Sequence, residues 1–172
     1  MAVYNSGYRL VGLETLRMGA VGGSGGIMGT TLNTLHNVVQ GSAFLAFEAP
    51  GKIELYNEDS DIADILIQTP GAKFVEFSVR DMDEFYFQLA FGGSTSGTTW
   101  SMAQTAVGSI EKSLQIISKD YGADKVRFDI PRVCVRGSGD LKFTKTDSGV
   151  ITFTCDIMMP ETLTPPIKMF IV

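Results

Sequence analysis

The stretch that decides the fold class lies near the end of the chain, at residues 150–157, which read VITFTCDI. Apolar and polar side chains alternate along it, and successive residues of a β-strand point to opposite faces of a sheet. β-Branched and aromatic residues, which favour strands, fill the run. It therefore predicts a half-buried strand whose apolar face carries Ile151, Phe153, Cys155 and Ile157.

Similar strand patterns precede this segment. We expect a strand at 139–146, joined to it by the turn Asp147-Ser148-Gly149, because these turn residues are typical of hairpins. A strand at 132–136 is expected before that, ending in the turn Gly137-Ser138-Gly139. Together the three segments predict an antiparallel meander with one buried face.

Strands are also expected through the rest of the chain. In residues 73–80, Val75, Phe77 and Val79 share one face, which we expect to be buried. Residues 112–119 fit a helical spacing as well as a strand, and we favour a strand that forms a hairpin with 125–130. The remaining predicted strands are 8–13, 42–48 and 52–56.

One helix is predicted at residues 82–91. Asp81 is the expected N-cap, and Glu84 lies three residues later in the capping-box position. Gly92-Gly93 provides the stop. Apolar side chains recur at helical spacing along one face, namely Met82, Phe85, Tyr86, Leu89 and Ala90. The expected fold class is therefore mainly β, an antiparallel β-sandwich or barrel with one short flanking helix.

Length and composition favour one domain over residues 1–172, with 44% apolar and 19% charged residues. We expect flexible loops at 19–29 and 56–66 and an extended C-terminal tail at 160–172. The apolar run 43–47 is far too short for a membrane helix, so no membrane association is expected. A net charge of −5 also makes tight phosphate binding a poor expectation.

No catalytic set can be assembled from the residue types present. His36 is the single histidine, and its neighbours include no nucleophile motif. Cys134 and Cys155 are expected to be buried free thiols. The acidic residues 58–64 are expected to form a solvated loop, with a weak cation site as the alternative. The sequence therefore predicts no enzyme activity, no cofactor and no metal.

The order of features gives the most specific hypothesis. A short helix after an acidic turn ends in Phe91-Gly92-Gly93, Gly29-Thr30-Thr31-Leu32 follows the glycine-rich loop, and Ile130-Pro131 starts the closing segment. Over residues 8–158 this order resembles the tail tube (major tail) proteins of long-tailed bacteriophages.

The resemblance implies a structural virion protein, assembled in the host cytoplasm and located in the tail. Six subunits would form a ring whose inner strands join into a continuous barrel, and stacked rings would form a hollow tube. The implied partners are further copies of the chain, a tape-measure protein, a tail terminator and baseplate or distal tail proteins. Double-stranded DNA would pass without specific binding. An acidic wall suits that role, because six copies at −5 each give −30 per ring.

Contacts between subunits or rings are expected at the two loops and the tail, where an apolar docking strand should support polymerisation. Three alternatives stay open. These are a tube like that of type VI secretion systems, another virion protein such as a capsid decoration protein, and a monomeric β-barrel that binds a small apolar ligand. The candidate contact residues are Gly22, Gly23, Gly25, Gly26, Asp59, Asp61, Ile167 and Phe170.

Overall fold

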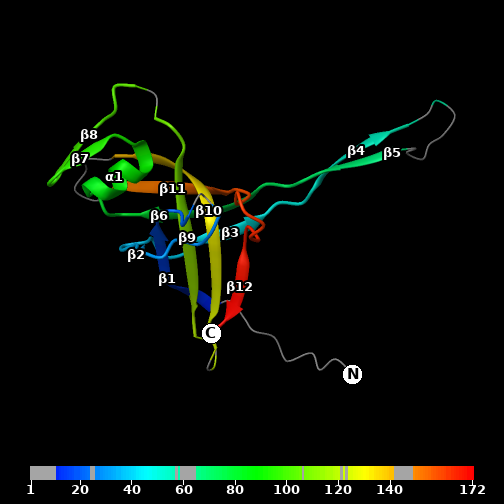
Figure 1. Ribbon diagram of the computed structural model, residues 1–172, viewed down its shortest axis with the longest axis horizontal. Helices are drawn as coiled ribbons and strands as arrows, with labels where there is room; N and C mark the ends of the chain where they lie inside the picture. Colours follow the sequence, from blue (N-terminus) through cyan, green and yellow to red (C-terminus); the bar gives the residue numbers. More distant parts are fainter. Residues whose placement is uncertain are drawn as a thin grey trace.

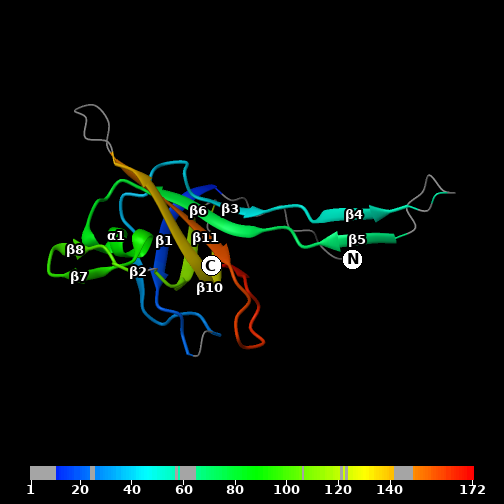
Figure 2. The same ribbon diagram turned by 90° about the horizontal axis from the view of Figure 1, so that it is seen from above.

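The computed structural model describes residues 11–23, 26–56, 58, 65–105, 107–120, 122, 124–141 and 149–172. The fold is mainly β and antiparallel with one short helix, as the sequence predicted (Figures 1 and 2). The elements are β1 (Val11–Gly19), β2 (Leu32–Thr34), β3 (Phe44–Phe47), β4 (Gly51–Leu55), β5 (Ile65–Thr69), β6 (Lys73–Val79), α1 (Glu84–Phe91), β7 (Ser94–Ser96), β8 (Thr99–Ser101), β9 (Ile110–Lys119), β10 (Val126–Asp140), β11 (Val150–Ile157) and β12 (Lys168–Ile171).

One eight-stranded sheet forms the body, in the order β2-β1-β9-β10-β11-β6-β3, with β12 attached to β10. Leu16 on β1 and Phe77 on β6 belong to the same buried core although three strands separate them in the sheet. The sheet must therefore curl around that core. The segment between β2 and β3 joins its two ends, since the Leu35 N–H donates to the Leu16 carbonyl and the Val39 N–H to that of Ser78, each at 2.8 Å.

The alternating patterns placed the core correctly. Val75, Phe77 and Val79 of β6 are buried against Ile151, Phe153 and Cys155 of β11. The rings of Phe77 and Phe153 stack at 5.2 Å between centroids. Residues 112–119 lie in β9, which pairs with β10, so the strand interpretation of that segment is confirmed.

The predicted turn at Gly137-Ser138-Gly139 is wrong, because β10 runs through it and pairs directly with β11. Gly137 lies opposite Phe153, and its missing side chain has a packing role. A Cβ built on Gly137 would overlap Ala90 of α1, so the glycine lets the helix lie against the sheet.

The predicted meander is therefore wrong in its arrangement. The expected strands 125–130 and 132–136 are parts of the single strand β10, with a change of register between Ile130 and Val133. Of the expected strand 139–146, residues 139–140 belong to β10 and Leu141 is outside any strand, while 142–148 lie outside the described residues.

The helix α1 begins two residues later than predicted. Its N-cap is Asp83, whose carboxylate accepts a hydrogen bond from the Tyr86 N–H at 3.0 Å. Asp81 instead accepts from the Asn37 side chain at 2.7 Å, and Met82 precedes the helix. Tyr86, Leu89 and Ala90 are buried as expected, whereas Phe85 is exposed. Gly92 ends the helix with φ +69°.

Two further strands differ from prediction. The strand expected at 8–13 is β1, which continues to residue 19, and residues 8–10 lie outside the described part. Strand β5 was not predicted, and its first residues had been assigned to a flexible loop. No helix in the described part of the chain is long and apolar enough to cross a membrane.

Candidate functional site

The β4–β5 hairpin projects from the body as a continuation of β3 and β6 (Figures 1 and 2). Residues 48–50 and 70–72 form a neck between the two strand pairs. There the Glu48 N–H donates to the Ala72 carbonyl at 2.9 Å. A Cβ on Gly71 would overlap the Glu48 carbonyl, so only glycine permits this close approach. The neck therefore directs the hairpin away from the sheet.

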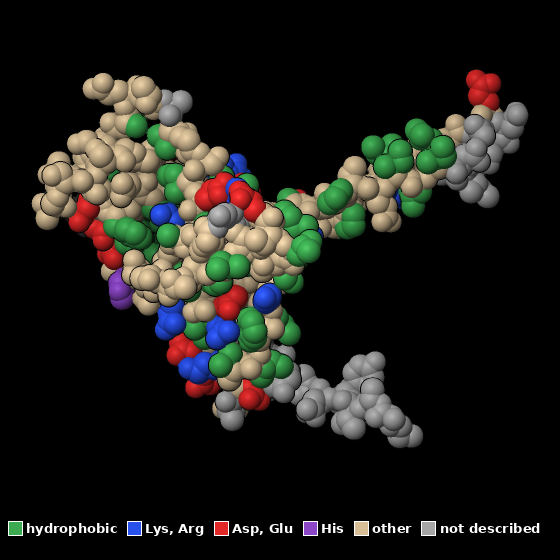
Figure 3. Space-filling model, viewed as in Figure 1, with side chains coloured by type: hydrophobic (Ala, Val, Ile, Leu, Met, Phe, Trp, Pro, Cys, Tyr) green, Lys and Arg blue, Asp and Glu red, His purple; other side chains and the backbone are tan. Residues whose placement is uncertain are grey.

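One face of the hairpin is apolar and uncovered. Ile53 pairs with Ile67 and Leu55 with Ile65, which places four aliphatic side chains on one face. Ile53 is 50% exposed and Ile67 is 45% exposed. Figure 3 shows hydrophobic side chains along this projection. An isolated two-stranded hairpin is marginally stable in water, so this face is suited to being covered by another surface.

The opposite face of the hairpin is more polar. Lys52 and Glu54 form an ion pair at 2.6 Å, and the Tyr56 hydroxyl donates to the Glu54 carboxylate at 2.5 Å. The hydrogen bonds from Lys52 and then Tyr56 lower the pKa of Glu54. The two faces therefore differ in chemistry, and the side chains of the apolar one are about half exposed.

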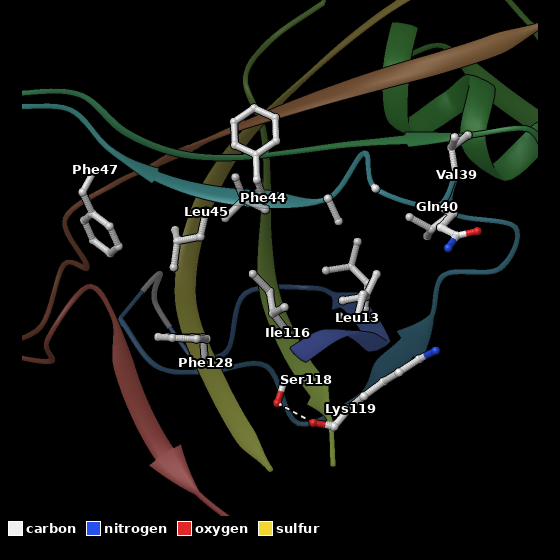
Figure 4. A pocket seen from close by; sticks show the side chains of 16 residues that line it. Leu13, Val39, Gln40, Phe44, Leu45, Phe47, Ile116, Ser118, Lys119 and Phe128 are labelled. Carbon is white, nitrogen blue, oxygen red and sulfur yellow. Dashed lines mark hydrogen bonds between the residues drawn. The ribbon is translucent and has the colours of Figure 1, made fainter. Parts of the chain in front are cut away.

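A second feature is a hollow of about 930 Å³ in the curled sheet, between β3 and β1. Figure 4 shows the side chains of Leu45 and Ile116 directed into the space between these strands. Strands β9 and β10 contribute further walls. The apolar lining residues include Leu13, Leu16, Val38, Val39, Ala43, Phe44, Leu45, Phe47, Val75, Ile116 and Phe128.

Lys119 is the one charged residue among the described residues that line the hollow. Ser118 beside it is satisfied by the backbone, since its hydroxyl accepts from the Val126 N–H at 2.9 Å and donates to the Lys119 carbonyl at 3.1 Å. The hollow therefore offers apolar surface and one cation at its rim. Within the described ranges, no group of three potential metal ligands comes together.

The glycine-loop candidates lie in a tight turn that packs against the C-terminal segment. The Gly22 N–H donates to the Ile27 carbonyl at 3.1 Å, and Gly23 has a positive φ of 57°. Gly26 is buried, and its carbonyl accepts from the Thr162 hydroxyl at 2.8 Å. The structure does not bring these glycines to the hairpin. Three candidates, Gly25, Asp59 and Asp61, lie outside the described residues.

The two tail candidates contact their own chain. Strand β12 pairs with the first half of β10, so the predicted docking strand docks within the molecule. Ile167 packs against the core, and the Arg127 guanidinium lies 4.4 Å from the centre of the Phe170 ring. Met169, Ile171 and Val172 stay exposed.

The reactive side chains do not converge. His36 is exposed, and it is its backbone that binds the Tyr86 hydroxyl. Cys155 is buried, which raises its pKa, whereas Cys134 is only half-buried, contrary to expectation. In the β10–β11 register Cys134 faces Asp156, and Cys155 faces Val135. The two thiols therefore lie on opposite faces of the sheet.

Neither a known protein-family model nor any curated protein sequence matches this chain significantly. The site must therefore be assessed from its own geometry. Sequence reasoning missed the apolar face of the hairpin, although a signal was present. The segment 52–55 (KIEL) alternates charged and apolar residues, the segment 65–68 (ILIQ) is mostly apolar, and the two flank an acidic stretch in the manner of a hairpin.

Proposed function

We propose that this chain is a structural subunit that joins copies of itself into rings, six to a ring, and that the rings stack into the hollow tube of a bacteriophage tail. The observation that carries the proposal is the uncovered apolar face of the β4–β5 hairpin, held away from the body by the neck. Such a face on a projecting hairpin favours contact with another molecule.

The geometry favours a particular kind of contact. The hairpin leaves the body in one direction, so a hairpin that packs on the body of the next copy joins two unlike surfaces. Contacts between unlike surfaces are heterologous, and they close into rings or continue as filaments. Strand β12, whose side chains are exposed and which pairs on one side with β10, offers a further edge for pairing between copies.

The charge balance supports the transport role. Each subunit carries −5, and a ring of six carries −30, which disfavours adhesion to DNA phosphates. DNA would pass through such a tube without sequence-specific binding. The ends of the tube would meet a tail terminator and distal tail proteins, and a tape-measure protein would occupy it before DNA does.

The proposal is tested by the size of the purified protein over a range of concentrations. Sedimentation velocity should reveal species far larger than the 18.6 kDa chain, and negative-stain electron microscopy should show rings or tubes. The double variant Ile53→Asp with Ile67→Asp should remain monomeric, because charge on the apolar face opposes its burial. Met102→Asp is the matched control, since Met102 is 70% exposed and far from the hairpin in sequence.

A monomeric protein that never associates would contradict the proposal. Closed shells or binding to preformed capsids would instead favour a decoration protein. The alternative of a tube like that of type VI secretion systems would give rings and tubes as well, and it differs in its cellular context.

The hollow favours a second candidate function, the binding of a small apolar ligand by a monomer. Its volume of about 930 Å³ lies within the range of small-molecule sites. A monomer whose melting temperature rises with added apolar ligands, and which forms no larger species, would favour this function.

A further inference from the structure

We infer that the hollow between β1 and β3 receives the apolar face of the β4–β5 hairpin of a second copy of this chain. The inference rests on the proposed function and deepens it, because it assigns the surface on which one subunit accepts the next. It joins the two uncovered apolar features described above into a single contact.

The two surfaces are chemically complementary. The hairpin presents the aliphatic pairs Ile53–Ile67 and Leu55–Ile65, and the hollow presents aliphatic and aromatic side chains such as Leu45, from five strands. The Ser118 hydroxyl in the hollow is already hydrogen-bonded within its own chain, so the hairpin would not have to supply a partner for it. Mutual burial of two such surfaces is favourable in proportion to the apolar area removed from water.

The charges of the two surfaces are also opposite in sign. The segment that joins β4 to β5 contains four acidic residues, Glu58, Asp59, Asp61 and Asp64, and residues 56–72 include no lysine or arginine. The single charged side chain in the described lining of the hollow is the cation Lys119. The approach of a negatively charged hairpin segment to Lys119 is electrostatically favourable.

The hairpin of the same molecule cannot fill its own hollow. Phe47 lines the hollow and is also the last residue of β3 before the neck, so the hairpin starts at the hollow and leads away from it (Figures 1 and 4). Folding back would break the bond between Glu48 and Ala72 and the close approach at Gly71. A second copy is the source of the hairpin that fits.

The decisive experiment is a complementation between two variants. The hairpin variant carries Ile53→Asp with Ile67→Asp, and the hollow variant carries Phe47→Asp with Lys119→Glu. Phe47 and Lys119 are both exposed, so these changes are compatible with folding, which circular dichroism would verify. Each variant alone should need at least about tenfold higher concentration than the wild type to associate.

Mixing the two variants should restore one contact and no more. The intact hairpin of the hollow variant would enter the intact hollow of the hairpin variant, and the resulting dimer has no second matching pair of surfaces. Sedimentation should therefore show a dimer in the mixture and longer species for the wild type. The Met102→Asp control should assemble as the wild type does.

The outcomes separate the inference from the proposed function. If the wild type and the hollow variant assemble equally well, the hairpin binds elsewhere and the inference is overturned while self-assembly stands. If the wild type itself stays monomeric at every concentration, the proposed function fails first. If the hollow variant instead loses only a melting-temperature shift caused by apolar ligands, the hollow is a small-molecule site and the inference is overturned.

Discussion

Phe77 and Phe153 in the curled sheet are completely buried, whereas Ile53 and Ile67 in the β4–β5 hairpin leave about half of their surface open. Both regions use strands with apolar faces. The sheet curls and covers its apolar face with α1. The neck instead directs the hairpin away from the sheet and from α1. The comparison shows that one part of the molecule buries its apolar side chains within the chain, whereas the other leaves them about half exposed.

The largest expected effect is the loss of stability caused by Phe153→Ala in the core. Loss of a buried, stacked ring should reduce the free energy of unfolding by about 3–5 kcal/mol. Ile67→Ala in the hairpin should change the unfolding of the dilute monomer by about 0.5 kcal/mol or less, since its side chain is already half in water. Urea titration of both variants measures the difference, and equal losses would contradict the contrast.

A smaller effect is expected where the helix meets the sheet. Gly137→Ala places a methyl group against Ala90, and overpacking of this kind costs about 1–3 kcal/mol. Gly108→Ala is the control, because a Cβ there has no atom within 4 Å and no positive φ. Thermal unfolding compares the two. If Gly137→Ala did not change the melting temperature, α1 would not be held tightly against β10.

The start of α1 provides a finer test. Asp83→Ala removes the N-cap hydrogen bond to Tyr86 and should reduce stability by about 1 kcal/mol. Asp81→Ala should cost less, because Asp81 binds the exposed side chain of Asn37 instead. Chemical denaturation measures the stability lost in each variant. A larger loss for Asp81→Ala than for Asp83→Ala would indicate that Asp81 is the N-cap.

The smallest expected effect depends on pH. The hydrogen bonds from Arg132 lower the pKa of Glu111 below its usual 4.5, so the pair stabilises the sheet above that pH and the contribution disappears as the pH falls through the lowered value. Glu111→Gln should therefore be less stable than the wild type at pH 7, with a difference that narrows below pH 4.5. Urea midpoints at pH 7 and pH 3 measure it. A constant difference would exclude this titration as the cause.

The sequence predicted the buried part of the molecule better than the projecting part. The alternation of apolar and polar residues in β6 and β11 predicted correctly which side chains are buried, because a core on one face constrains every second residue. The prediction of a turn at Gly137 was wrong. Glycine permits close packing as well as a turn, and only the position of Ala90 shows that it serves packing here. The helix was placed two residues early because Asp81 and Asp83 are equally good caps.

The candidate site was harder to predict. The three successive apolar residues 65–67 do not alternate with polar ones, since each face of a free hairpin lacks a core to constrain it. The hollow draws its lining from five strands and the segment before β3, and their proximity depends on how the sheet curls. The contact residues predicted in the glycine-rich loop and in the C-terminal tail, such as Gly26 and Ile167, pack against their own chain instead.

The neck has a mechanical consequence. Five paired positions at about 3.4 Å each make the hairpin a lever about 17 Å long, so a tilt of the body by about 10° displaces its far end by about 3 Å. In an assembly of the proposed kind, a small rotation between neighbouring subunits would therefore move the far ends of β4 and β5 by a few ångströms. A long filament built from such levers can follow a curve while each subunit keeps its internal shape.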